Sequence, residues 1–270
     1  MAMNAERHID FNVRAYNRTF DSYEKVHTEI FNPVEQARLH TKLAQAAGYI
    51  KTRSATRRAL DYGCGTGNLT NHLIGLGFHV TSADTSAKCL ALTKKKYSGT
   101  GILETVEING RDLIGIEDNS FDLTAIYSVL HHIPDYLQAV KEAIRVTNRG
   151  GAIYIDHEHS PSYWNRNKEY KEFLRLVTPK KTLKRFLKLS NYIININKII
   201  NPRYHPEGDM HLWLDDHIEW GKIEHVLNAE GCEIVINEDY LLYDSRYPID
   251  VYEKYKDKCN DIRLICAVKR

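Results

Sequence analysis

The residues of this chain that are most clearly arranged for chemistry are an aspartate and three closely spaced glycines. A short apolar run ends in Asp61, and Gly63, Gly65 and Gly67 follow at alternate positions. Glycine permits a tight turn from a strand into a helix, and because it lacks a β-carbon it lets a ligand approach the backbone. Leucines recur at helical spacing from Leu69 onward, so the loop is expected to open a helix.

The spacing of these glycines distinguishes the loop from two other ligand-binding loops. The pattern is GxGxG, and Asn68 stands where the dinucleotide fingerprint GxGxxG has its third glycine. No GK[ST] sequence follows, so a phosphate-cradling P-loop is not predicted.

Further polar residues stand at the ends of apolar runs downstream. A second run ends in Asp84, seventeen residues after Gly67. An acidic residue at the end of the second strand of a Rossmann-like sheet accepts hydrogen bonds from ribose hydroxyls. A third run precedes Asp112, and a fourth precedes Ser128. The alternation of strand and helix patterns predicts a parallel sheet with helices on both faces.

Together these motifs resemble the class I S-adenosylmethionine (SAM) methyltransferases. The resemblance is carried by the glycine loop, by Asp84 and by the SxLHHIPD segment that begins at Ser128. It covers residues 55–160 well and residues 215–268 more weakly. It implies an α/β fold with a Rossmann-like seven-stranded sheet of order 3-2-1-4-5-7-6 whose last strand is antiparallel. It also implies SAM as cofactor and S-adenosylhomocysteine as product.

The resemblance assigns cofactor contacts to the glycine loop, to the strand ends and to the N-terminal segment. The residues concerned are Tyr16, Asp61, Gly63, Cys64, Gly65, Gly67, Asp84, Thr85, Asp112, Leu113 and Ser128. Asp84 is expected to bind the ribose, and Asp112 with the Leu113 backbone the adenine edge. Asp61 is expected to orient the loop or to meet the amino group of SAM, and Ser128 to meet the methionine end.

Methyl transfer from SAM depends mainly on proximity and orientation, although some hydroxyl acceptors also need a base. Histidines His131 and His132 follow the fourth strand, and Asp156, His157 and further polar residues follow the fifth. Both groups lie at carboxyl ends of strands, where the crevice of an open α/β sheet is found. We interpret the first pair chiefly as part of the loop and favour His157 as the base, with His132 as second candidate. The spacing of the histidines does not match a metal-binding helix, and no metal site is predicted.

The chain divides into three predicted parts. Residues 1–54 look helical and form an N-terminal lid, in which Tyr16 and Tyr23 either close over SAM or pack in the core. Residues 55–157 and 215–270 form the SAM-binding core. Residues 158–214 form a helical cap inserted after the fifth strand, where they would wall the acceptor pocket.

The cap segment has an unusual charge. Between residues 160 and 204 eleven lysines and arginines face only two glutamates, a local charge of +9 in a chain of net charge +2. Apolar residues recur there at helical spacing between the lysines: Leu183, Phe186, Leu187 and Ile194. Three interpretations stay open: a packed lid with a solvated basic face, a site for an anionic or lipid-linked substrate, or a nucleic-acid contact.

The composition indicates a cytoplasmic globular protein. No run of eighteen apolar residues occurs, so no transmembrane segment is predicted, and residues 1–10 lack the apolar core of a signal peptide. The five cysteines form no CxxC pair and no metal-ligand spacing, which is typical of free thiols in a reducing compartment.

We therefore predict a methyltransferase that acts on a small molecule. The sequence after the fourth strand is Tyr127-Ser128-Val129-Leu130, which departs from the [DNS]PP[YFW] motif of enzymes that methylate amino groups of DNA adenine or protein glutamine. Oxygen is accordingly favoured as the methylated atom, with nitrogen and carbon open. The alternatives are an RNA-modifying methyltransferase, indicated by the basic segment, and a non-catalytic SAM-binding protein.

Overall fold

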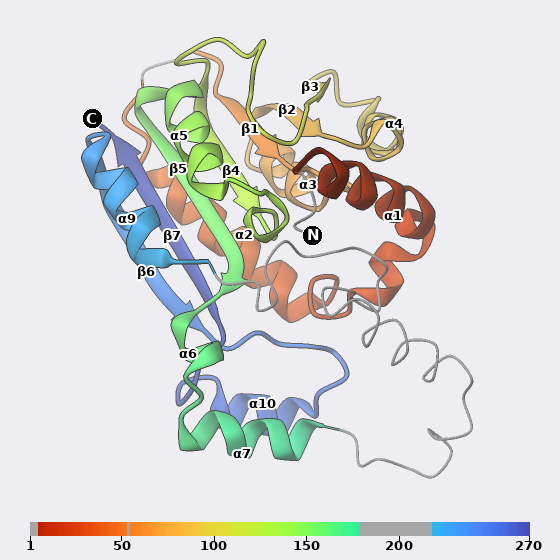
Figure 1. Cartoon of the computed structure of the whole chain (residues 1–270), viewed down its shortest axis with the longest axis vertical. Helices are drawn as coiled ribbons and strands as arrows, with labels where there is room; N and C mark the ends of the chain where they lie inside the picture. Colours follow the sequence, from red (N-terminus) through yellow and green to blue (C-terminus); the bar gives the residue numbers. More distant parts are fainter. Residues whose placement is uncertain (1–4, 53–54, 179–217) are drawn as a thin grey trace.

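A single seven-stranded sheet organises the molecule (Figure 1). The computed structural model describes residues 5–52, 55–178 and 218–270. The strand order is β3-β2-β1-β4-β5-β7-β6, which confirms the predicted order. The strands are β1 (Arg58–Tyr62), β2 (His79–Asp84), β3 (Leu103–Glu107), β4 (Phe121–Tyr127), β5 (Thr147–His159), β6 (Cys232–Tyr240) and β7 (Ile262–Lys269).

The pairing of the strands also agrees with the prediction. Strands β1 to β5 pair in parallel, whereas β7 runs antiparallel to both β5 and β6. All the carboxyl ends of β1 to β5 therefore meet at one edge of the sheet. The crevice of an open α/β fold lies at that edge.

Helices cover both faces of the sheet. They are α1 (Ala5–Val26), α2 (Pro33–Gly48), α3 (Asn68–Gly75), α4 (Ala87–Tyr97), α5 (Tyr136–Val146), α6 (Pro161–Trp164), α7 (Lys168–Val177), α9 (Trp220–Ala229) and α10 (Ile249–Tyr255), with a 3₁₀ turn at Leu130–His132. One buried cluster joins α5 and α9 to the sheet, and a second joins α2 and α3 to the opposite face. Burial of apolar side chains on two faces is the main stabilising contribution to such a three-layer fold.

The C-terminal part differs in detail from the sequence-based expectation. The helix expected from residue 216 begins at Trp220 in the described residues, and Gly231 follows its end with φ +76°, as expected of a helix stop. Strand β6 extends beyond the predicted residue 237 to Tyr240, and the short helix α10 was not predicted. Its Tyr252 and Tyr255 are buried against Phe173 of α7 in a third cluster.

Only the beginning of the predicted cap is described. After the end of β5 its residues form α6 and α7, and α7 lies beside α10 below the main sheet in the view of Figure 1. Leu183, Phe186, Leu187 and Ile194 lie outside the described residues, so their predicted helix stays a prediction. In the described part of the chain, no helix is long and apolar enough to cross a bilayer.

Candidate active site

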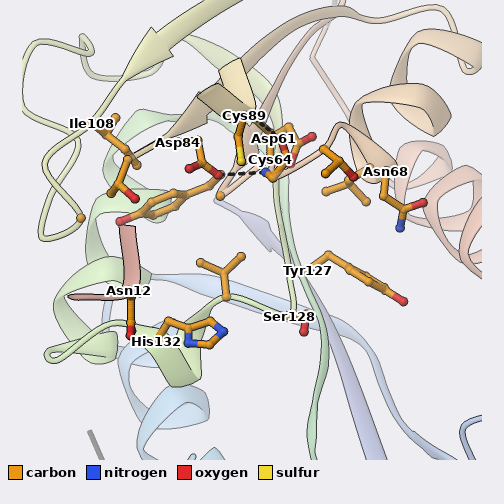
Figure 2. Close-up of a pocket in the computed structure, with 18 of the residues that line it drawn as sticks. Asn12, Asp61, Cys64, Asn68, Asp84, Cys89, Ile108, Tyr127, Ser128 and His132 are labelled. Atoms are coloured by element: carbon orange, nitrogen blue, oxygen red, sulfur yellow. Dashed lines mark hydrogen bonds between the residues drawn. The ribbon is translucent and has the colours of Figure 1, made fainter. Parts of the chain in front are cut away.

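A cavity opens at the carboxyl edge of the sheet, beside the ends of β1, β2 and β4 (Figure 2). It contains about 1110 Å³ of empty space, including open solvent at its mouth. Its walls come from α1, the glycine loop, the turns after β2, β3 and β4, and the segment before α2.

The three glycines of the loop have positive φ angles for which glycine is well suited, but they face different neighbours. A β-carbon on Gly63 would lie 2.5 Å from a methyl carbon of Val129. On Gly67 it would lie 3.1 Å from Thr93 and from Tyr97 of α4, and Gly67 does not line the cavity. On Gly65, which does line it, the β-carbon would meet nothing within 4 Å. Gly67 is thus explained by packing against α4, whereas Gly65 leaves open space for a ligand.

Asp84 lies where the sequence predicts, at the end of β2 and in the cavity wall. Its Oδ2 accepts a hydrogen bond from the Gly65 N–H at 2.8 Å, and its Oδ1 accepts one from the Ser86 N–H at 2.8 Å. Burial raises the pKa of the Asp84 carboxyl, although these backbone donors oppose the shift. The carboxylate therefore fixes the glycine loop to β2 and still borders the cavity.

Asp61 borders the same cavity from the end of β1 and is 1% exposed. Thr70 of α3 donates a hydrogen bond to its Oδ2 at 2.5 Å, and the Thr70 hydroxyl lies 2.7 Å from that of Ser82. Burial raises the pKa of Asp61 to about 7, with a smaller contribution from the negative charge of Asp84. Near neutral pH this carboxyl is therefore sensitive to any cation placed beside it.

The turn after β3 differs from the sequence-based assignment. Asp112 and Leu113 do not line the cavity, and the Leu113 N–H donates to Glu142 at 2.9 Å. Ile108 and Gly110 of the same turn line it instead. The resemblance to the methyltransferase family points to an acidic residue after the third strand, and the sequence contains no signal that singles out its apolar and glycine neighbours.

The histidines that follow β4 and β5 are placed differently. His132 lines the cavity, while His131 directs its Nδ1 to Glu158 at 2.8 Å. His157 does not line the cavity, and its ring centroid lies 4.7 Å from that of Tyr127, which does. Burial lowers the pKa of His157 to about 4, so the ring is neutral at physiological pH. His157, the preferred base candidate, therefore lies outside the cavity wall, whereas His132, the second candidate, is part of it.

Comparisons with known proteins agree with this geometry. Residues 60–155 match the family model described as a methyltransferase domain. Demethylmenaquinone methyltransferase of Bacillus mycoides is 27% identical over 168 residues, which are 60% of this chain and 71% of the relative. The enzyme of that name from Staphylococcus aureus is 35% identical over 127 residues, so this chain spans about half of its length (52%).

Solved structures show the same fold at lower identity. The YcgJ protein of Bacillus subtilis gives a TM-score of 0.52 at 16% identity, covering 86% of this chain and 99% of that protein. A SAM-dependent methyltransferase of Methanosarcina mazei gives 0.53 at 18% identity, covering 83% and 95%. This chain contains a class I SAM-dependent methyltransferase domain. Its cofactor is SAM.

Helix α1 contributes part of the cavity wall, and its role as a lid stays a prediction. Ile9, Asn12 and Tyr23 of α1 line the cavity. The Tyr23 ring packs 6.1 Å from that of Phe31, which also lines it. The side chain of Tyr16 lies outside the described part of the structure, so its contact with SAM stays a prediction.

A network of buried charges behind Tyr127 was missed by the sequence analysis. Arg38 of α2 forms two hydrogen bonds to Glu35, at 2.6 and 2.8 Å, and one to Asp156 at 2.8 Å. Tyr154 and Tyr240 donate to Asp156 at 2.5 and 2.9 Å, and Tyr127 donates to Glu35 at 3.0 Å. Asp156, one of the polar residues after the fifth strand, is therefore fully engaged within the protein.

Proposed function

We propose that this methyltransferase transfers the methyl group of SAM to a small molecule, with oxygen as the favoured methylated atom. The observation that carries the proposal is the lining of the cavity. Tyr23, Phe31 and Tyr127 line it together with the glycine loop, and α1 contributes to its wall. Aromatic and apolar walls with a few polar groups are typical of small-molecule sites.

The residues of the cavity fit SAM as follows. The open side of Gly65 leaves room for the cofactor beside the backbone. The Asp84 carboxylate can accept further hydrogen bonds from ribose hydroxyls, since it has about four lone-pair positions and the backbone N–H groups of Gly65, Thr85 and Ser86 do not use all of them. Asp61 supplies a negative charge for the ammonium group. Ile108 and Gly110 border the space on the far side of Asp84 and fit the adenine ring.

His132 is the residue that we propose as the base for a hydroxyl acceptor. It lies in the cavity wall after β4, and methyl transfer to a hydroxyl oxygen requires that a proton leave that oxygen. SAM supplies an electrophilic methyl group on a sulfonium and leaves as neutral S-adenosylhomocysteine. His132 would accept the hydroxyl proton, so the charge lost from the sulfonium appears on the imidazole.

The named relatives provide a first compound to test. They are demethylmenaquinone methyltransferases, and a planar apolar acceptor suits walls made of tyrosine, phenylalanine and isoleucine. An anionic acceptor is the second class to test, because the sequence between residues 160 and 204 carries a charge of +9.

The experiment uses SAM labelled with ¹³C in its methyl group. The full chain is incubated with reduced demethylmenaquinone, with phenols, carboxylic acids and amines, and with bulk RNA. The ¹³C chemical shift of the product then reports whether the methyl group is bound to oxygen, nitrogen or carbon. We expect a small-molecule product that carries an O-methyl group, with turnover lowered about a hundredfold or more in His132→Gln.

A small-molecule product with the methyl group on carbon or nitrogen would contradict the assignment to oxygen. Labelled RNA without any small-molecule product would overturn the proposal. Unchanged turnover in His132→Gln with a hydroxyl acceptor would remove His132 as the base.

A further inference from the structure

The turn after β4 forms one wall of the cavity and has an unusual conformation. Ser128, Val129, His132 and Ile133 all line the cavity. Ser128 has φ +58°, a left-handed conformation that is uncommon for residues other than glycine. Such a conformation persists only where the surroundings hold it in place.

One buried carboxylate holds this turn. Glu158 of β5 is 2% exposed, and its Oε1 accepts hydrogen bonds from the backbone N–H groups of Val129 at 2.9 Å and Leu130 at 2.7 Å. Its Oε2 lies 2.8 Å from Nδ1 of His131. Hydrogen bonds that involve a charged group are the strong ones in proteins, so three of them on one side chain fix the turn firmly.

An irregularity in β5 explains why Glu158 faces this turn. Ile155 pairs with Ile265 of β7, but Glu158 pairs with Arg263, so three steps along β5 correspond to two along β7. The extra residue lies at a β-bulge that includes His157, whose φ is +63°. Because side chains alternate between the two faces of a strand, a one-residue insertion exchanges the faces beyond it.

The position of this turn determines how the cavity wall packs against the glycine loop. The methyl groups of Val129 occupy the space where a β-carbon of Gly63 would be, at 2.5 and 2.8 Å. Any movement of the Val129 backbone therefore shifts the wall that faces the cofactor. Close packing transmits such shifts, because protein interiors contain few voids that absorb them.

We propose that Glu158 is a positioning residue for the SAM site: it acts through the N–H groups of Val129 and Leu130 and sets the cavity wall between Ser128 and Ile133. The inference rests on SAM binding in this cavity and is independent of the identity of the methyl acceptor. Without the carboxylate, two buried N–H groups lose their acceptor and the turn leaves the conformation that the cofactor needs.

The test uses two substitutions that differ only in hydrogen bonding. Glu158→Met keeps length and approximate volume but removes both acceptor oxygens. Glu158→Gln keeps one oxygen for the two N–H groups. The matched control is Asp122→Ala, which removes another carboxylate that is 1% exposed and accepts a backbone N–H, that of Arg58 at 2.9 Å, at the opposite edge of the sheet.

Calorimetry with S-adenosylhomocysteine and amide hydrogen exchange at Val129 and Leu130 are the measurements. We expect Glu158→Met to weaken S-adenosylhomocysteine binding by about ten- to a hundredfold and to remove exchange protection at both amides. Glu158→Gln should restore protection and bind within a few-fold of the parent. Asp122→Ala should lower the unfolding midpoint while leaving the affinity unchanged.

Several outcomes would overturn the proposal. One is parental affinity in Glu158→Met with both amides still protected, and another is an equal loss of affinity in the Asp122→Ala control. If Glu158→Met does not fold, a tenfold or larger loss of affinity in a folded Glu158→Gln protein contradicts the acceptor role. A parent protein that fails to bind S-adenosylhomocysteine would instead contradict the assignment of the cavity to the cofactor.

Discussion

Two pairs of carboxylates lie near the same edge of the sheet but have different kinds of partner. Asp61 and Asp84 border the cavity, and their partners are backbone N–H groups and the hydroxyl of Thr70. Glu35 and Asp156 lie behind Tyr127 and share the guanidinium of Arg38. Within the described residues, the first pair has no cationic side chain beside it and the second pair has one between its members.

The difference indicates which of these carboxylates can still bind a cationic or hydrogen-bonding ligand. Removing a carboxylate from water is costly unless a positive charge or several donors compensate it. Behind Tyr127 the protein supplies the cation itself, so that α2 is tied to β5 and, through Tyr240, to β6. Burial raises the pKa of both cavity aspartates and also that of Glu35, so the two pairs differ in the presence of the cation and not in the direction of the pKa shift. In the proposed assignment, the ammonium group of SAM would supply a cation for this pair, and its ribose hydroxyls would supply further hydrogen-bond donors.

The strongest way to test the comparison is to remove the shared cation. We expect Arg38→Met to lower the free energy of unfolding by about 3–5 kcal/mol, because it leaves two buried carboxylates without their partner. The folded fraction should still bind S-adenosylhomocysteine with nearly parental affinity, since Arg38 does not line the cavity. Urea unfolding followed by circular dichroism measures the first effect, and calorimetry the second.

Arg145→Met is the control for that experiment. Arg145 also joins two carboxylates, those of Glu142 and Asp118, but its side chain is 30% exposed. Ion pairs of this kind contribute only about 0–1 kcal/mol. Equal destabilisation by the two substitutions would show that the buried Arg38 network stabilises the fold no more than the partly exposed Arg145 ion pairs do.

A smaller effect, on binding, is expected at the cavity. Asp84→Ala removes the acceptor proposed for the ribose hydroxyls, and a hydrogen bond to a charged group contributes roughly 1.5–3 kcal/mol. The affinity for SAM should therefore fall by about ten- to a hundredfold or more in a calorimetric titration.

Glu107→Ala provides a matched control for Asp84. Glu107 ends the neighbouring strand, pairs in register with Asp84 and is exposed outside the cavity. Its loss removes the same charge and should leave SAM affinity close to the parental value. Parental affinity in Asp84→Ala would show that the ribose is held elsewhere.

The features that the sequence predicts well are those encoded by neighbouring residues. The glycine loop, the carboxylate at the end of β2 and the alternation of strands and helices follow from short spacings and from the family resemblance, and the sheet order agrees with them. The spacing of Gly63, Gly65 and Gly67 is local, although only the structure shows that Gly67 packs against α4 instead of lining the cavity.

The features that could not be predicted depend on contacts between distant segments. Arg38 and Asp156 are 118 positions apart, and nothing in either local sequence indicates their pairing. His157 looked suitable as a base because it follows a strand, but the bulge in β5 gives it a positive φ and directs Glu158, in its place, toward the turn after β4. A one-residue irregularity in a strand changes which side chain faces a site, and no spacing rule reveals it.

The smallest expected effect concerns the protonation of Asp61. Its pKa is about 7 in the folded protein against 3.8 for an exposed aspartate. Between roughly pH 4 and pH 7 the folded state therefore binds more protons at this position than the unfolded state, and stability falls as the pH rises through that window. Ionisation of Asp61 in the ligand-free protein is thus destabilising, and a bound cation should reverse this.

That reversal gives a test by pH. The ammonium group of SAM beside Asp61 would favour the carboxylate and lower its pKa, so binding should release a fraction of a proton near pH 7 and strengthen as the pH rises from 6 to 7.5. The gain is limited to about tenfold in affinity per pH unit, because one group titrates. Calorimetry in two buffers of different ionisation heat measures the released protons directly. Asp61→Asn should bind more weakly and lose the proton release. A parent protein that binds equally well at both pH values without releasing protons would place the ammonium group away from Asp61, and the carboxyl would then serve only to hold Thr70 and the glycine loop.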